Sequence, residues 1–119
     1  MARYLILIYG SQARWDANSP AEWQQIDEGH RAFRAKAGTA VLASGELESS
    51  ETATTLRGID QGRPVITDGP YAESKETLGG FYVVRAADLD EAISYASVLA
   101  EVGHDHSCVE VRPLVDHGE

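Results

Sequence analysis

Apolar residues along the chain gather into short runs that predict strands. A run of six residues, from Tyr4 to Tyr9, stops at Gly10 and is typical of a buried strand. Further short runs, apolar or rich in β-branched residues, predict strands over 40–47, 52–57, 63–67, 80–86 and 107–114. The turn-like composition of 58–62 joins the second and third of these later strands into a hairpin.

Two other segments repeat apolar residues every three or four positions, which is the spacing of one helix face. The first segment begins with Ser19 as a cap and Pro20 at the first helical position, and Glu22 completes a capping box. Gly38 ends this helix. Its apolar face consists of Trp23, Ile26, His30, Phe33 and Ala37.

The second helix follows Asp88, which forms another capping box with Glu91, and Gly103 closes it. The resulting order is β-α-β, a hairpin, then β-α-β, and no repeat or linker interrupts it. This order predicts a single domain over residues 1–119. The fold class is α+β, in the ferredoxin-like β-α-β-β-α-β arrangement with an extra hairpin.

Both central strands of such a sheet are apolar on both sides, at 4–9 and at 81–84. A sheet with one face in water should instead alternate apolar and polar residues. The two helices cover only one face, and no further residues remain to cover the other. We therefore expect a homodimer packed sheet against sheet.

Charge narrows the possible partners. The 119 residues include 19 Asp and Glu but only 10 Lys and Arg, a formal net charge of −9. Such a surface repels phosphate backbones and anionic lipid, so we expect neither a nucleic-acid nor a membrane partner.

Cys108 is the single cysteine, which excludes an intrachain disulfide. The longest apolar run is too short for a membrane span or a signal peptide, so we expect a cytoplasmic protein.

A specific signature occupies residues 67–76, TDGPYAESKE, and continues as LGGFY over 78–82. It resembles the signature of the YCII-related family, and within that family the DGPF branch. Flanking residues agree with the resemblance at 7–10, 52–57, 88–92 and 109–113. Tyr71 stands where the family usually has Phe, and Ser74 where it usually has Thr.

The resemblance implies a dimeric α+β barrel and, in YCII-type relatives, a pocket faced by a histidine and an aspartate. It also implies that an extracytoplasmic-function sigma factor is a possible partner, because some DGPF members are linked to such factors by gene context. It assigns no reaction.

His30 and Asp68 are the candidate catalytic residues. His30 lies in the apolar face of the first helix, where an imidazole is either a hydrogen-bonded structural residue or a general acid or base lining a pocket. Asp68 follows a strand directly. It could turn back to orient His30, as in other dyads, or it could only organise the turn before Gly69 and Pro70.

Candidate substrate-binding residues surround this pair in the signature, together with one strand arginine that could grip a carboxylate. They are Arg57, Gly69, Pro70, Tyr71, Glu73, Lys75 and Glu76, with Ser44 and Thr54 as weaker candidates. The alternative is that the charged residues form a solvated loop, that the glycines only allow tight backbone geometry, and that Arg57 forms a strand-surface salt bridge.

A metal site is suggested by His104 and His106, two positions apart with Cys108 continuing their face. The segment begins just past Gly103, where polar loops are exposed, so we expect no metal. Cys108 is more simply a small apolar filler than a thiol nucleophile paired with His106. No phosphate loop and no nucleotide, flavin or haem signature is visible, so we expect no cofactor.

Two hypotheses of function follow. In the first, the chain is an enzyme that acts on a small organic molecule without a cofactor, with His30 moving a proton and Asp68 orienting it. In the second, it is a binding or regulatory module, whose pocket holds a metabolite or whose surface meets a protein partner.

Overall fold

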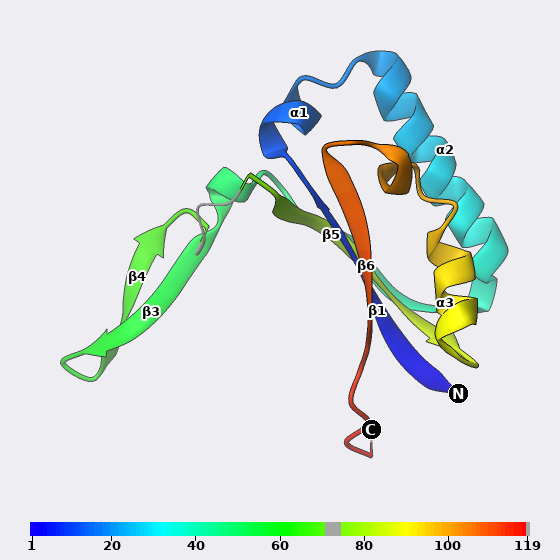
Figure 1. Ribbon diagram of the computed structural model, residues 1–119. Helices are drawn as coiled ribbons and strands as arrows, with labels where there is room; N and C mark the ends of the chain where they lie inside the picture. Colours follow the sequence, from blue (N-terminus) through cyan, green and yellow to red (C-terminus); the bar gives the residue numbers. More distant parts are fainter. Residues whose placement is uncertain (71–74, 119) are drawn as a thin grey trace.

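The computed structural model describes residues 1–70 and 75–118, and its main body is a four-stranded antiparallel sheet with helices on one face (Figure 1). The strand order is β2-β5-β1-β6, where β1 spans Ala2–Gly10, β2 Val41–Glu46, β5 Thr77–Ala86 and β6 Ser107–Pro113. With the hairpin set aside, this is the ferredoxin-like order, with the first and third strands in the centre. The predicted fold class is confirmed.

Helix α2, Pro20–Ala37, begins and ends where the sequence predicts. The Glu22 backbone N–H donates to the Ser19 hydroxyl oxygen at 3.2 Å, and the Ser19 N–H donates back to the Glu22 carboxylate at 3.0 Å. Gly38 ends the helix at φ +54°, a left-handed value that glycine adopts without a Cβ penalty. The capping box and the terminator are both confirmed.

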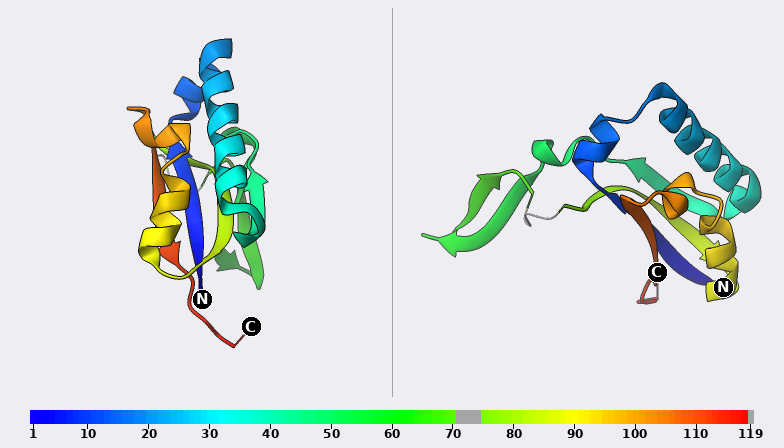
Figure 2. Two further views of the ribbon diagram at one scale, coloured as in Figure 1. Left: turned by 90° about the vertical axis from the view of Figure 1, so that its right-hand side faces the viewer. Right: turned by 45° about the horizontal axis from the view of Figure 1, so that its top comes forward.

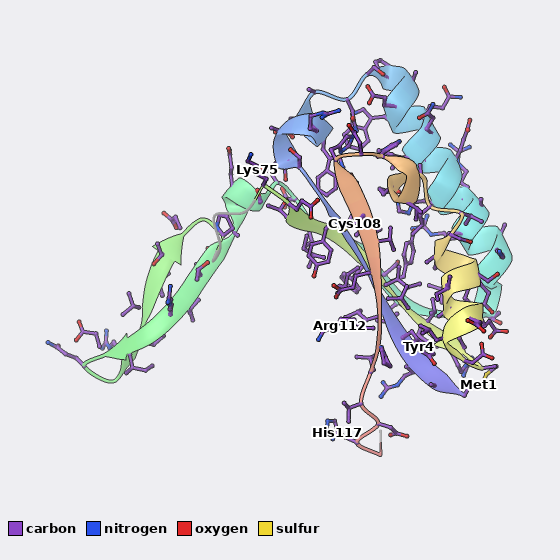
Figure 3. The ribbon with its side chains drawn as sticks, viewed as in Figure 1. Met1, Tyr4, Lys75, Cys108, Arg112 and His117 are labelled. Atoms are coloured by element: carbon purple, nitrogen blue, oxygen red, sulfur yellow. The ribbon has the colours of Figure 1, made fainter. Side chains whose placement is uncertain are left out.

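The core lies between the helices and the sheet (Figure 2), and side chains fill this layer (Figure 3). Alternate residues of the central strands enter it because successive strand side chains point to opposite faces. Its largest fully buried side chains are Phe33, Ile6, Leu99 and Val84. The opposite face of the sheet carries Leu5 and Leu7 from β1, paired with Val83 and Phe81 of β5. No described helix covers that second face (Figure 2).

Two helical details differ from the prediction. Ser11 caps a short helix, α1, Gln12–Asp16, in a segment for which the sequence patterns predict neither helix nor strand. Helix α3, Leu89–Ala96, was expected to run on toward Gly103, but it stops at Ala96 and a separate 3₁₀ turn, η3, spans Ala100–Gly103. None of the described helices combines the length and apolar character needed to cross a membrane.

Strands β3, Thr54–Asp60, and β4, Arg63–Asp68, form a separate hairpin that projects from the body (Figure 1). Gln61 and Gly62 both have positive φ, as the favoured two-residue hairpin turn requires. The radius of gyration is 16.3 Å, against about 13.5 Å for a compact chain of this length. The hairpin therefore makes the molecule extended.

Candidate functional site

A cavity of about 510 Å³ lies between α2 and the neighbouring strands β2 and β5. That volume is within the range of small-molecule sites. Residues of β1, α1, α2, β2, β5 and η3 all contribute to its wall. The cavity thus forms where α2 leaves the sheet edge partly uncovered.

Trp15 of α1 lines the cavity. Its indole packs against the backbone of Gly10 and Gly79, and a Cβ atom added at Gly79 would lie 2.5 Å from the ring. Both positions must therefore lack a side chain for the indole to sit there. Gly79 belongs to the family signature, so this contact gives one signature glycine a defined role.

His30, Tyr82 and Glu101 form a hydrogen-bonded chain in the cavity wall. Nδ1 of His30 lies 2.5 Å from the Tyr82 hydroxyl oxygen, and Nε2 lies 3.0 Å from Oε2 of Glu101. A carboxylate only accepts hydrogen bonds, so Glu101 selects the imidazole tautomer with its proton on Nε2. Nδ1 is then an acceptor, and the Tyr82 O–H donates to it.

Gly29 allows Glu101 to reach the histidine. A Cβ atom at Gly29 would lie 2.8 Å from the backbone nitrogen of Ala100, the first residue of η3. The absence of a side chain on α2 therefore lets η3 approach closely and place Glu101 beside His30. A glycine in the interior of a helix costs about 0.5–1 kcal/mol relative to alanine, and here the close approach explains its presence.

Burial determines the electrostatics of these three hydrogen-bonded side chains. Glu101 is 4% exposed and Tyr82 is 3% exposed, while the His30 side chain is 23% exposed. Burial raises the pKa of the Tyr82 hydroxyl above its ordinary value of 10, the Arg34 guanidinium opposes this shift, and Glu101 adds to it. Tyr82 therefore keeps its proton at neutral pH, in agreement with its role as donor to His30.

Oε1 of Glu101 is buried and has no hydrogen-bond partner among the described residues. A buried carboxylate oxygen without a donor is costly, and native structures satisfy most such atoms. Because Glu101 lines the cavity, a bound molecule with a donor group could supply the missing hydrogen bond.

The structure does not bring Asp68 to His30 within the chain. Both ring nitrogens of His30 already contact Tyr82 and Glu101, whereas Asp68 ends β4 and pairs with Thr54 across the hairpin. Asp68 is followed by Gly69 at φ +99°, whose N–H donates to the Ala53 carbonyl at 2.6 Å. Asp68 therefore lies at the turn that leaves the hairpin, whereas α2 and His30 belong to the main body.

The described signature residues before β5 do not line the cavity of His30, whereas Gly79 and Tyr82, later in the same signature, do. Pro70, Lys75 and Glu76 line a second, more open hollow with residues of α1, and Figure 3 shows Lys75 where the hairpin joins the body. Arg57 is exposed on β3. Tyr71 and Glu73 lie outside the described residues. Among the weaker candidates, Ser44 does line the cavity.

The histidine-rich segment after Gly103 gathers no metal-binding group of three or more ligand residues in the described ranges 1–70 and 75–118. The His104 and His106 rings lie 5.3 Å apart, and His106 Nδ1 contacts the Ser107 hydroxyl at 2.9 Å. Desolvation and the nearby Glu76 and Glu110 raise the pKa of the Cys108 thiol, which disfavours the reactive thiolate.

Comparison with known proteins identifies the class. Residues 2–116 match the YCII-related domain. The chain is also 34% identical, over 113 residues, to "Uncharacterized protein R00369" of Rhizobium meliloti (strain 1021), covering 93% of this chain and 90% of that protein. The chain therefore belongs to the YCII-related family. Among solved structures it is similar to 5-chloro-2-hydroxyhydroquinone dehydrochlorinase (TftG) from Burkholderia phenoliruptrix AC1100 in complex with 2,5-dihydroxybenzoquinone, at 22% identity and a TM-score of 0.40, covering 96% of this chain and 95% of that one.

Sequence reasoning found His30 but missed its partners. Tyr82 was assigned to a strand and to the signature at 78–82 but not to the site, although it lies on the same strand face as the buried Val84. Glu101 lies in a short segment that carries no motif. It reaches His30 because the preceding residue, Ala100, packs closely against Gly29. The signal for Tyr82 was therefore present, and the signal for Glu101 was not.

Proposed function

We propose that this chain is an enzyme that moves a proton on a small organic molecule held in the cavity beside His30, without a bound cofactor. The observation that supports this proposal is the Tyr82–His30–Glu101 chain in the cavity wall, with both end residues buried. Titratable groups that contact one another in a cleft are a general mark of active sites.

The proton path follows from the tautomer. The Tyr82 oxygen takes a proton from the substrate while its own proton passes to Nδ1 of His30. The resulting imidazolium is stabilised by the Glu101 carboxylate at Nε2. The reverse transfer returns the proton to another atom of the same molecule, so proton balance is kept without an added reagent. Isomerisation next to a carbonyl is a reaction of this kind, and in an elimination the proton would instead pass to the leaving group, which departs in its protonated form.

Deuterium exchange tests the proposal directly. The protein is incubated in D₂O with a panel of ketones, β-dicarbonyl compounds and amino ketones, and the loss of C–H signals is followed by ¹H NMR. We expect faster exchange of at least one compound with the wild type, and about 100-fold slower exchange in His30→Gln, since general acid–base catalysis contributes that much or more. Glutamine retains hydrogen bonding at this position but does not titrate.

Asp68→Asn separates the two possible partners of the histidine. We expect this variant to keep the wild-type exchange rate because Asp68 lies on the hairpin, and Glu101→Gln to lose it. If no compound exchanges although one binds in the cavity, the chain is a binding module and the enzyme proposal fails. If His30→Gln exchanges at the wild-type rate, the proposed proton path is wrong.

We also propose the homodimer. The face of the sheet away from the helices carries the half-buried Leu5, Phe81 and Val83 beside the buried Leu7, and the extended hairpin exposes 60% of Leu56, 73% of Ile59 and 62% of Ile66. Apolar surface of this extent is typical of an interface. We expect sedimentation equilibrium to give twice the 12.9 kDa chain mass, and Val83→Glu to give the single-chain mass. Membership of the DGPF branch likewise stays a proposal that rests on residues 67–76.

A further inference from the structure

The charge around the cavity is strongly one-sided. Five carboxylates line it against a single guanidinium, that of Arg34. The acidic residues are Asp16, Asp27, Glu46, Glu48 and Glu101. Asp27, Glu46 and Glu48 are exposed at the rim and form no ion pair within the described part of the chain. An anionic molecule would therefore be repelled, and a cation attracted, before it reached the interior.

Arg34 does not cancel this charge at the rim. Its guanidinium carbon lies 6.0 Å from the centre of the Tyr82 ring, above the aromatic face. It is thus directed toward the hydrogen-bonded side chains, while Asp27, Glu46 and Glu48 have no cationic partner among the described residues.

Two indole rings also line the cavity, one from each of the first two helices. Trp15 of α1 is half-buried, and Trp23 of α2 is 42% exposed. Indole faces attract organic cations through the ring quadrupole, most strongly when the cation also loses water. Aromatic walls with carboxylates at the rim match the two properties of an organic ammonium ion, an apolar body and a positive charge.

The interior of the cavity adds an independent requirement. Oε1 of Glu101, in a side chain more than nine-tenths buried, lacks a donor among the described residues. The other oxygen of the same carboxylate is already bonded to His30. This acceptor can take a hydrogen bond from an N–H or O–H group of a ligand, and the surrounding charge favours N–H on a cation.

We propose that the cavity takes a small organic cation with an N–H donor, such as a protonated primary amine on a planar apolar body, with the amine hydrogen-bonded to Glu101 Oε1. This inference rests on the proposed function for the identity of the site, and it names the class of substrate. The amine end would lie beside Glu101, and the reacting C–H beside the Tyr82 hydroxyl.

Four probes of similar size test the class. Binding of benzylamine, benzyltrimethylammonium, benzyl alcohol and benzoate is measured by chemical-shift perturbation of the indole N–H signals. We expect benzylamine to bind about tenfold more tightly than benzoate, with benzyltrimethylammonium between them because it has the charge without the N–H donor. The preference should fall as salt rises, since the rim charges are screened. Equal or tighter binding of benzoate would overturn the proposal.

Variants assign the two contributions. Glu101→Gln should remove the advantage of benzylamine over benzyltrimethylammonium, and the double variant Asp27→Asn, Glu48→Gln should reduce the advantage of both cations over benzoate. Asp90→Asn on α3 is the matched control, an exposed carboxylate that does not line the cavity, and should change neither ratio. The exposed rim variants keep the test decisive if Glu101→Gln does not fold, and unchanged ratios in them contradict the proposal.

The two proposals fail separately. If benzylamine binds preferentially but no amine-bearing compound exchanges deuterium, the ligand class stands and the enzyme does not. If exchange occurs only with neutral or anionic carbonyl compounds, the enzyme stands and the cationic class is wrong.

Discussion

The body and the hairpin of this molecule hold together by different means. In the body, side chains of α2, of α3 and of the central strands bury one another, and Phe33 is fully buried. In the hairpin, the β3–β4 ladder and a two-residue turn carry the structure, and all six residues of β4 are exposed. An isolated two-stranded hairpin is marginal in water. The difference teaches that the body is stable through its own core, whereas we expect the hairpin to depend on the second copy proposed above.

Truncating an apolar side chain in each region gives the largest contrast. Phe33→Ala should lower the free energy of unfolding by about 3–5 kcal/mol because it leaves a cavity in the core. Ile59→Ala, at a position 73% exposed, should lower it by less than about 0.5 kcal/mol when the chain is dilute. Urea denaturation measures both.

Protein concentration sharpens this contrast. If a second copy covers the hairpin, the loss of stability caused by Ile59→Ala should grow as the protein becomes more concentrated. The loss caused by Phe33→Ala should not depend on concentration in this way, because Phe33 is buried within its own chain. A large effect of Ile59→Ala at every concentration would show that the hairpin contributes to the stability of the single chain.

A smaller effect is expected where α2 meets η3. Gly29→Ala should destabilise the protein by about 1–2 kcal/mol, since the new Cβ would meet backbone at 2.8 Å and η3 would have to move. Gly103→Ala, in the same η3 turn, is the control because its added Cβ meets nothing within 4 Å. Thermal unfolding of the pair measures the difference, and equal melting temperatures would contradict the close approach.

The smallest effect concerns alkaline pH. The pKa of Tyr82 is raised above 10 in the folded state, chiefly by burial, so the unfolded chain loses this proton first. The associated stability is present below pH 10 and is lost as the pH rises above 10 through the raised value. The wild type should therefore lose stability more steeply above pH 10 than Tyr82→Phe, as measured by urea denaturation at several pH values. Parallel curves would contradict the raised pKa.

Local patterns predicted most of the fold because each pattern has one dominant physical cause. The Ser19–Glu22 capping box and Gly38 located both ends of α2, and two-sided apolar strands identified β1 and β5 as central. The α1 helix was missed because its residues are polar on most positions, and only Trp15 anchors it. Such a helix is stabilised by tertiary contact with Gly10 and Gly79, which no local pattern reports.

The site was harder to predict because it depends on contacts distant in the chain. His30 was recognisable as an imidazole on an apolar helix face, but its partners lie 52 and 71 residues away. Asp68 was chosen for its place in a signature, and the topology puts that signature at the exit of the hairpin. A signature indicates a family reliably, yet it does not state which of its residues face the cavity.

The position of the hairpin in the strand order has one more consequence. β2 and β5 are antiparallel neighbours in the sheet, and the hairpin lies in the connection between them, after the cavity residues Leu47, Glu48 and Ser49. A tight loop of a few residues could join the same two strands without changing any pairing of the sheet. The hairpin is therefore an insertion that evolution or an engineer can lengthen, shorten or remove, which leaves the body free to be reused with a different appendage.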